Sequence, residues 1–424
     1  MLHKTFRLAG RPLLVTRLNV RQYGHQGLEM AMSFALARRT GADVCFLRPK
    51  QVVSEAMFQI EPDDVRVVRG GVRARFAGAA WGVSDRRERV RAYRGYIAMI
   101  TRREVFLEIE RYMDTHVLAK PVRGGLKEAQ RGIKALGDRH ARAVELPLYY
   151  QRRLLRERVA VHLRPRALAE ACATAARCGL DPGAPVITLH VREAGWKFGH
   201  EMQDAKPGAR DDSTRNARIA SYFDAIDDLV ARGFTIVRLG DPSMTPIHRA
   251  GVVDLATSPQ RTNLLELYCM LRSTFFISGE AGPVGVSYLT NTPLLTVNAT
   301  DPISSYPIRD DGMFIPKDVV DRATGRPLML DELVGHEHLG DLRSVTRFQY
   351  IENTSEDIRL AALEMLAWVQ GDHRETVAQA RFRELAARAG EELRASLNYV
   401  RKWGSDQGFI GDGRVCRFYA ERHS

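Results

Sequence analysis

One segment of the chain, from Val186 to Asp241, has the order strand, loop, helix, strand. It begins with a β-branched, apolar run that ends at His190, Val191 and Arg192, which is typical of a buried strand. A helix and a second strand, Phe234 to Leu239, follow. Such a unit normally builds a parallel sheet whose ligand lies at the carboxyl ends of the strands. We therefore expect an α/β fold with a binding site after the first of these strands.

The same alternation occurs on both sides of this segment. Near the start of the chain we expect a strand over 12–18, a turn around Tyr23 to Gln26, a helix over 28–39 and a strand over 43–47. Downstream we expect a helix over 166–178, then a helix over 264–271, a strand over 274–278, a helix over 284–289 and a strand over 293–298. Two Rossmann-like domains with parallel sheets facing across a cleft account for this pattern.

The remaining segments fit less regular structure. The spacing of apolar residues predicts a helix over 88–118, whereas 299–350 is rich in Pro, Gly and Asp and is expected to be a long loop. Thr354 and Asp357 form a capping box for a long helical region from Glu356, which Gly371 interrupts. The expected domains are 1–150 on the acceptor side, 151–355 for the nucleotide sugar, and 356–424 for the C-terminal helices and tail.

Composition favours a protein of a reducing compartment. The five cysteines are scattered and include no CxxC pair, which argues against disulfide or zinc frameworks. Arginines interrupt each apolar stretch near the start, and no run of about 18 apolar residues occurs. We expect a cytoplasmic protein without a secretion signal or a spanning helix, at or near the inner face of the membrane.

The formal charge of +12 invites a nucleic-acid interpretation. Only nine of the 63 basic residues are lysine, and arginine also dominates helices that look structural. Solvated basic faces explain most of the excess, and attraction to an anionic membrane or substrate explains more of it than nucleic acid does. No aromatic platform lies beside the basic clusters, so a nucleic-acid partner is not expected.

Arg192 is the strongest candidate for binding a phosphate. A guanidinium stays charged and can hold two phosphate oxygens at once. Together with His190 it ends a strand that is expected to be buried, where a charge needs a partner. The alternative is a structural salt bridge with Asp241 or Glu193.

Two further pairs lie close to this strand in the same segment. Arg215 and Asn216 start the following helix, where they either contact the donor or cap the helix. Gly240 and Asp241 end the second strand. Asp241 either binds a nucleoside or holds Arg238.

A glycine-rich turn, Gly279 to Gly282, follows the strand that ends at Ser278. A strand that leads through such a turn into a helix exposes backbone N–H groups suited to a diphosphate. The same pattern also serves as a plain structural turn, and no GKS or GKT marks a P-loop. Glu280 would repel a phosphate, so we expect it to point to a ribose, a sugar hydroxyl or Arg192.

Three other residues are weaker candidates. Lys317 stands out because lysine is rare, although a surface position explains it as well. His25, or Glu29 one helical turn later, is a candidate general base. The Asp-Asp pairs form no convincing metal site, so neither a metal nor another cofactor is expected.

Taken together, these motifs resemble a family of bacterial glycosyltransferase-like proteins from surface-polysaccharide gene clusters. The likeness rests on motifs within 190–330: His190–Glu193, Ser213–Asn216 before a helix with Tyr222, Val237–Gly240, Phe276–Gly279 with Gly282, Asn298, Ile315–Lys317, Gly325 with Arg326, and Leu330. More distantly, the chain is similar to fucosyltransferase-type enzymes of GT-B architecture. The resemblance implies that Arg192 neutralises the diphosphate of a nucleotide sugar and that Asn298 and Lys317 belong to the donor site. The HVRE sequence lacks the second arginine of the fucosyltransferase HVRRxD pattern, which argues against GDP-fucose.

We therefore expect a metal-independent glycosyltransferase that moves a hexosyl or deoxyhexosyl group from a nucleotide-sugar donor to a surface glycan or its lipid-linked precursor. Two alternatives stay open. One is transfer of another group, such as pyruvyl from phosphoenolpyruvate, and the other is a non-catalytic scaffold that binds nucleotide sugars.

Overall fold

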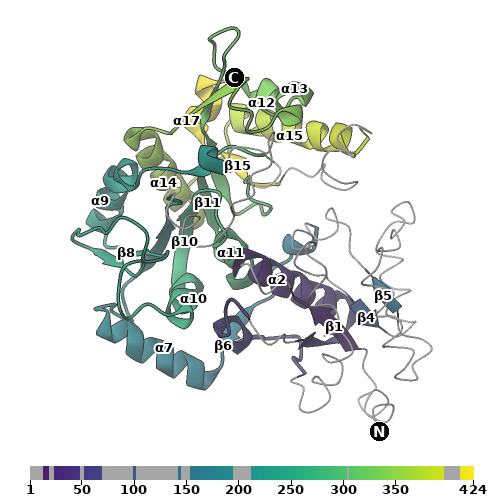
Figure 1. The fold of residues 1–424 in the computed structure, drawn as a ribbon, viewed down its shortest axis with the longest axis vertical. Helices are drawn as coiled ribbons and strands as arrows, with labels where there is room; N and C mark the ends of the chain where they lie inside the picture. Colours follow the sequence, from purple (N-terminus) through teal and green to yellow (C-terminus); the bar gives the residue numbers. More distant parts are fainter. Residues whose placement is uncertain are drawn as a thin grey trace. The chain divides into compact units, whose positions relative to one another are not determined.

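The structure of the chain is a computed structural model, shown in Figure 1. It describes residues 13–18, 23–47, 52–68, 99–101, 142–144, 153–193, 212–302, 305–395 and 411–424. The chain divides into two units. The first is Met1–Pro165 with Tyr288–Asn291, and the second is Arg166–Ser287 with Thr292–Ser424.

The first unit contains the expected strand, helix and strand near the start of the chain. Strand β1 (Leu13–Arg17) and strand β2 (Asp43–Leu47) are parallel, and helix α2 (Tyr23–Thr40) connects them. The helix begins at Tyr23, so the expected turn at 23–26 is wrong, because these residues form its first turn. Its buried side chains, from Met30 to Ala37, belong to the core of this unit.

The rest of the first unit's sheet is antiparallel. Strand β4 (Met99–Thr101) pairs with β1 and with strand β5 (Arg142–Val144), which gives the order β2-β1-β4-β5. The predicted helix over 88–118 is therefore wrong at Met99–Thr101, and its other residues lie outside the described ones. A second antiparallel pair joins strand β3 (Ile60–Pro62), after the short helix η1 (Ala56–Gln59), to strand β6 (Val161–Leu163).

The second unit is built on a sheet of seven parallel strands in the order β15-β12-β11-β10-β7-β8-β9. This confirms the α/β class. The strands are β7 (Val186–His190), β8 (Thr235–Arg238), β9 (Val252–Asp254), β10 (Ser273–Ser278), β11 (Leu294–Ala299), β12 (Met313–Pro316) and β15 (Arg414–Val415). Every residue of β7, β11 and β12 is buried, as in a sheet covered on both faces.

The helices of this unit present apolar faces to the sheet. In α9 (Phe223–Ala231) the buried residues are Ala225, Ile226 and Leu229, at helical spacing. Helix α14 packs on α9 and on strands β10 to β12, and α10 packs on β7 and β10. The other bounds are α7 (Pro165–Arg177), α10 (Asn263–Arg272), α11 (Val284–Thr290), α14 (Ser355–Gln370), α15 (Val377–Ala395) and α17 (Arg417–Arg422). The first residue of α7 and the last three residues of α11 are assigned to the first unit. No helix in the described residues is long and apolar enough to cross a membrane.

The long loop expected over 299–350 is wrong, because this segment contains short regular elements. After β12 come a hairpin of β13 (Asp318–Asp321) and β14 (Phe348–Ile351), and between these strands the helices α12 (Leu330–Leu333) and α13 (His336–Gly340). Each element spans four or five residues, which is too short for a period to show in the sequence.

The predicted start and interruption of the C-terminal helices are confirmed. The hydroxyl of Thr354 accepts a hydrogen bond from the N–H of Asp357, whose carboxylate in turn accepts from Thr354. Gly371 ends α14 with φ +82°, a left-handed conformation that favours glycine.

A pair of buried asparagines fixes the end of β11. The N–H of Asn298 donates to Oδ1 of Asn353 at 2.8 Å, and the N–H of Asn353 donates to Oδ1 of Asn298 at 2.8 Å. Nδ2 of Asn298 reaches the hydroxyl of Tyr222, and Nδ2 of Asn353 donates to the carbonyl of Pro316. Asn298 has φ +58°, which asparagine tolerates better than most residues. The pair ties β11 and β12 to the chain that enters α14.

Candidate functional site

The order of strands in the second unit creates a switch point between β7 and β10. Starting from β7, the chain adds β8 and β9 on one side and then β10, β11 and β12 on the other, which is the order of the doubly wound nucleotide-binding fold. Ligands of such sheets bind in the crevice at the carboxyl ends of the two central strands. Here the ends are His190 and Ser278, which pair in register, followed by Arg192 and by the turn Gly279–Gly282.

Arg192 connects the two sides of this switch point. Its Nε donates to Oδ1 of Asn216 at 3.2 Å, and its Nη1 donates to the carbonyl of Glu280 at 3.3 Å. The side chain is half-buried, which leaves part of it exposed at the end of the sheet. Glu193 contacts Arg238 instead, so Arg192 does not depend on Glu193 for a counter-charge.

Asn216 joins Arg192 to a second cation. Lys317 follows β12 directly, and its Nζ donates to the backbone carbonyl of Asn216 at 2.9 Å. Only 3% of Lys317 is exposed, so the surface interpretation of this lysine is wrong. Arg215, the residue before Asn216, ends the short helix η4 (Asp212–Arg215). The second short helix, η5 (Ile219–Tyr222), leads into α9.

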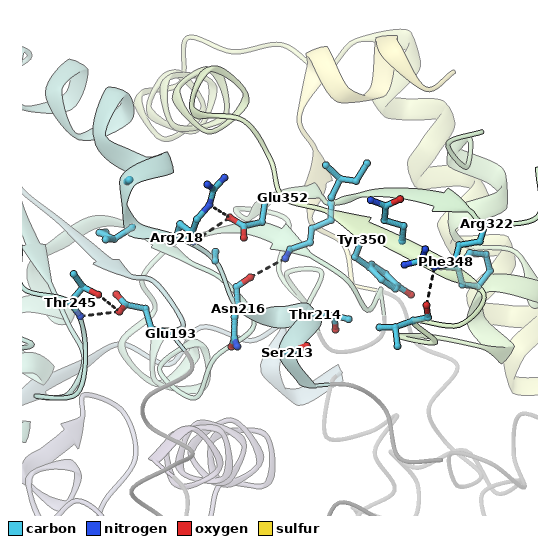
Figure 2. A pocket seen from close by; sticks show the side chains of 17 residues that line it. Glu193, Ser213, Thr214, Asn216, Arg218, Thr245, Arg322, Phe348, Tyr350 and Glu352 are labelled. Carbon is cyan, nitrogen blue, oxygen red and sulfur yellow. Dashed lines mark hydrogen bonds and ion pairs between the residues drawn. The ribbon is translucent and has the colours of Figure 1, made fainter. Parts of the chain in front are cut away.

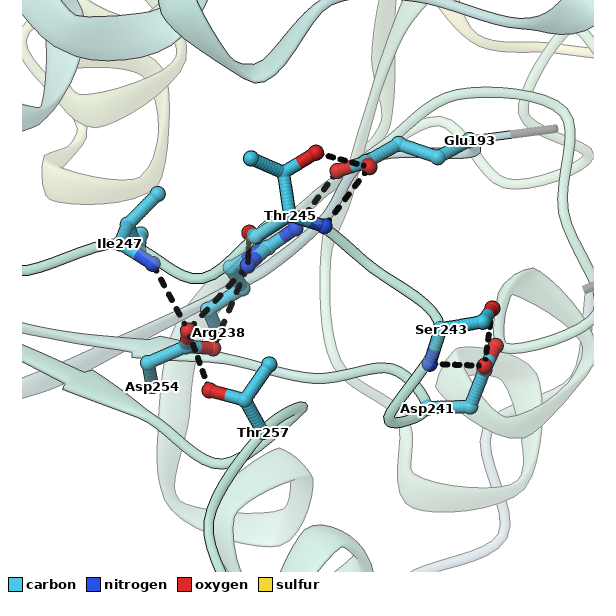
Figure 3. Close-up of polar contacts among 8 residues, drawn as sticks. All are labelled: Glu193, Arg238, Asp241, Ser243, Thr245, Ile247, Asp254 and Thr257. Carbon is cyan, nitrogen blue, oxygen red and sulfur yellow. Dashed lines mark hydrogen bonds and ion pairs between the residues drawn. The ribbon is translucent and has the colours of Figure 1, made fainter. Parts of the chain in front are cut away.

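A buried ion-pair network fixes the loops behind Arg192 (Figure 3). Arg238, fully buried at the end of β8, donates to Glu193 at 2.7 Å, to Asp254 at 3.2 Å and to the carbonyl of Thr245 at 2.6 Å. The other oxygen of Glu193 accepts from the N–H and the hydroxyl of Thr245. This network holds Glu193, and with it the chain next to Arg192, against the end of β8.

Asp241 does not hold Arg238, which was one of the two roles expected of it. Its carboxylate accepts hydrogen bonds from the N–H and the hydroxyl of Ser243, as Figure 3 shows, and it does not hold Arg238. Gly240, the residue before it, has φ +154°, and a Cβ there would lie 2.2 Å from the sulfur of Met244. The close packing of Gly240 is a sufficient reason for a glycine at the end of β8.

The expectation that the Glu280 side chain points to Arg192 or to a sugar is also wrong. Its carboxylate is buried and forms an ion pair with Arg343, and one oxygen accepts from the hydroxyl of Thr300 at 2.7 Å and from the N–H of Asp301 at 2.9 Å. Only the backbone carbonyl of Glu280 meets Arg192. A buried carboxylate needs such partners because its desolvation is costly. The glycine turn is thereby fixed to the segment after β11.

His190 lies buried between charged groups at the end of β7. Burial, and then the positive charge of Arg238, lower the pKa of His190 to about 4, and Arg192 acts in the same direction. Its Nδ1 has no hydrogen-bond partner in the described part of the chain. The imidazole is therefore neutral at pH 7, and it adds no positive charge to the switch point.

The lowered pKa of His190 predicts a stability that falls in acid. Between about pH 6.5 and pH 4 the unfolded chain binds a proton on His190 and the folded chain does not, so the free energy of unfolding drops as the pH falls through this window. The full effect is about 3 kcal/mol. In urea unfolding, the free energy of unfolding of the wild type should fall relative to that of His190→Asn as the pH is lowered, because the variant has no imidazole to protonate. A difference that stays constant with pH would contradict this, and His336→Gln, at an exposed histidine, is the control.

The remaining sequence candidates divide between the two units. His25, which is exposed, and Glu29, which is buried, lie in α2 of the first unit. All the others belong to the second unit. Among these, Ser278 donates its hydroxyl to the carbonyl of Gly279. The side-chain amide of Asn298 donates from Nδ2 to the hydroxyl of Tyr222 and accepts at Oδ1 from the N–H of Asn353.

A pocket of about 760 Å³ lies within the second unit (Figure 2). One wall is formed by all residues from Ser213 to Ala220 except Arg215, and another by β14 (Phe348–Ile351) together with Glu352. Glu193, Thr245, Lys317, Arg322 and Val345 complete the lining. The residues of β14, Arg322 and Thr245 were not among the candidates, and no local signal marks them, because they meet only through the tertiary fold.

Among the described residues, no group of three or more His, Cys, Asp or Glu side chains could hold a metal ion. The expected independence from metal stays a prediction that needs a direct test.

Comparison with known proteins gives matches among solved structures. No protein-family model and no curated protein matches the chain. The chain is similar to ADP-heptose lps heptosyltransferase II of E. coli, with 11% identity over 84% of this chain and 99% of that chain, and a TM-score of 0.42. It is also similar to the E. coli heptosyltransferase WaaC, with 14% identity, 72% and 90% coverage and a TM-score of 0.31. The fucosyltransferase NodZ from Bradyrhizobium matches with 12% identity over 66% of this chain and 92% of that chain, and a TM-score of 0.26.

Proposed function

We propose that this protein is a glycosyltransferase of GT-B type whose second unit binds a nucleotide-sugar donor. The observation that carries the proposal is the position of Arg192, a half-buried cation at the switch point of a doubly wound parallel sheet. In this kind of sheet the switch point is where nucleotides bind. The acceptor we propose is a surface glycan or its lipid-linked precursor at the inner face of the membrane.

The chemistry requires charge stabilisation on the leaving group. The bond between the anomeric carbon and the diphosphate oxygen breaks, the acceptor hydroxyl oxygen bonds to that carbon, and the nucleoside diphosphate leaves with the electron pair. Arg192 and the backbone of the turn Gly279–Gly282 are the groups we assign to this diphosphate. Fixed positive groups can stabilise it without a metal ion, which is why we propose a metal-independent reaction.

A base must also take the proton of the acceptor hydroxyl. His25 and Glu29 remain the candidates, because α2 follows the first strand of the first unit's βαβ element, where ligand-contacting groups are common. The buried, neutral His190 is a poor base at pH 7, because its pKa is only about 4.

A nucleotide-binding panel tests the donor site. We expect one of GDP, UDP, CDP, CMP, ADP or dTDP to raise the melting temperature of the wild type in a thermal-shift assay, equally with magnesium and with EDTA. Arg192→Ala should lose most of this stabilisation because it removes the main cation at the switch point. No response to any nucleotide would contradict the proposal, and a response to phosphoenolpyruvate alone would favour a pyruvyl transferase instead.

A further inference from the structure

The charge of Lys317 is only partly satisfied inside the protein. Its Nζ makes one hydrogen bond, to the carbonyl of Asn216, and no described carboxylate lies within ion-pairing distance of it. Yet Lys317 is only 3% exposed and lines the pocket. An ammonium group has three N–H donors, and burying it with few partners is costly. Burial accordingly lowers the pKa of Lys317, although Glu352 and Glu280 act in the other direction.

The carboxylates nearest to Lys317 are engaged by other cations. Glu352 accepts from the N–H of Arg218 at 3.2 Å, and its Oε2 lies 3.6 Å from Nε of Arg218. Glu280 pairs with Arg343. The third carboxylate, Glu193, which also lines the pocket, pairs with the buried Arg238. Lys317 is thus the buried cation of the pocket for which a bound anion would be the natural partner.

The pocket has room for far more than an inorganic ion. Its volume of about 760 Å³ falls in the range of sites for small organic ligands. Ser213, Thr214 and Gln349 supply hydroxyl and amide groups, and Val345 and Ile351, each 42% exposed, supply apolar surface. Figure 2 shows Asn216, Tyr350 and Glu352 among the side chains that line the pocket. Hydroxyl-binding groups together with apolar patches suit a sugar ring, which has both polar edges and C–H faces.

This pocket is distinct from the contacts of Arg192. The lining includes Asn216 and Glu193 but not Arg192. Asn216 separates the two cations, because its side-chain oxygen accepts from Arg192 and its backbone oxygen accepts from Lys317. One residue therefore positions a cation for the diphosphate and, on its other side, a second cation for another group.

We infer that the pocket is an anion subsite in which Lys317 binds the acidic group of a sugar, a carboxylate or a phosphate carried on the glycosyl unit of one of the two substrates. This inference rests on the proposed function, because it assigns an acidic sugar to the glycosyl transfer. Its site, however, can be tested without turnover and without a nucleotide.

The test compares glucuronate and glucose 6-phosphate with glucose in thermal-shift titrations of the full chain. We expect at least one of the acidic sugars, but not glucose, to raise the melting temperature of the wild type. Lys317→Met should lower the apparent affinity for the acidic sugar in these titrations by about tenfold or more, since it removes a charge-assisted hydrogen bond. Arg192→Ala should leave it unchanged. The matched control is Arg383→Met, which removes a positive charge from the exposed face of α15.

A second variant covers the case in which Lys317→Met is poorly folded. Ile351→Glu places a carboxylate on an exposed position of the pocket wall and should also weaken binding of the acidic sugar, while its melting temperature stays near that of the wild type. Equal responses of the wild type and both variants, or no response of the wild type to either acidic sugar, would overturn the inference.

Pyrophosphate separates this inference from the proposed function. If Lys317→Met weakens only the response to pyrophosphate, Lys317 belongs to the donor diphosphate, and the acidic-sugar subsite is wrong while the proposed function stands. If Arg192→Ala keeps full nucleotide affinity, the proposed function fails, whatever the sugars show.

Discussion

Replacing Arg192 with alanine is expected to lower kcat/KM for glycosyl transfer by about a hundredfold to a thousandfold, the usual effect of removing one group that stabilises the charge of a transition state. The physical reason is the position of the guanidinium, which spans from Asn216 to the carbonyl of Glu280 at the switch point. Negative charge grows on the leaving diphosphate during the reaction, so the loss should appear mainly in kcat. Steady-state kinetics with the donor found in the nucleotide panel measure it.

Two variants make this result specific to Arg192. Arg192→Lys keeps the charge but loses the planar fork, and should recover only part of the activity. Arg232→Ala removes an exposed arginine just beyond the C-terminus of α9 and should behave as the wild type. If Arg192→Ala turns over at a near-normal rate while remaining folded, Arg192 has no part in the reaction.

Arg238→Met should lower the free energy of unfolding by about 3–5 kcal/mol, which is the usual cost of removing one member of a buried ion pair. Arg238 is fully buried and holds both Glu193 and Asp254. Without it, two largely buried carboxylates face each other with no cation between them. Urea unfolding at pH 7 measures the loss, and nucleotide affinity should fall with it because Glu193 adjoins Arg192.

The comparison that isolates the charge effect uses the same network. Adding Glu193→Gln and Asp254→Asn to Arg238→Met removes the unpaired charges and should restore a large part of the lost stability. The exposed pair of Arg249 and Asp227 is the matched control, since Arg249→Met should cost at most about 1 kcal/mol. If Arg238→Met and Arg249→Met lower the free energy of unfolding equally, burial of the Arg238 network does not increase its contribution to stability.

The parts of the fold that could be predicted are those whose residues repeat one pattern over enough length. The run Val186–His190 is mostly apolar, because β7 is covered on both faces of the sheet. The glycine-rich turn after β10 can be read directly from the sequence. Both sides of the switch point could therefore be located. The short strand Met99–Thr101 could not, since three residues carry no period and its partners are distant in the sequence.

The ion-pair partners of the buried charged residues also could not be predicted from the sequence. Glu280 is 63 positions from Arg343, and Arg238 is 45 positions from Glu193. A sequence shows that a charge is placed where it needs compensation, but the compensating residue is chosen by the tertiary fold. For the same reason Lys317 looked like a surface residue, although β12 carries it into the lining of the pocket.

The reciprocal hydrogen bonds between Asn298 and Asn353 restrict how these two positions can change during evolution. Each side-chain oxygen accepts from the other residue's backbone N–H, so replacing either asparagine leaves the buried N–H of the other without an acceptor. The left-handed backbone at Asn298 narrows the tolerated replacements further. A lineage that replaced one asparagine would keep the folding defect even if the other changed too, because the unpaired donor is a backbone N–H. The two positions, 55 residues apart, are therefore expected to be inherited as one unit.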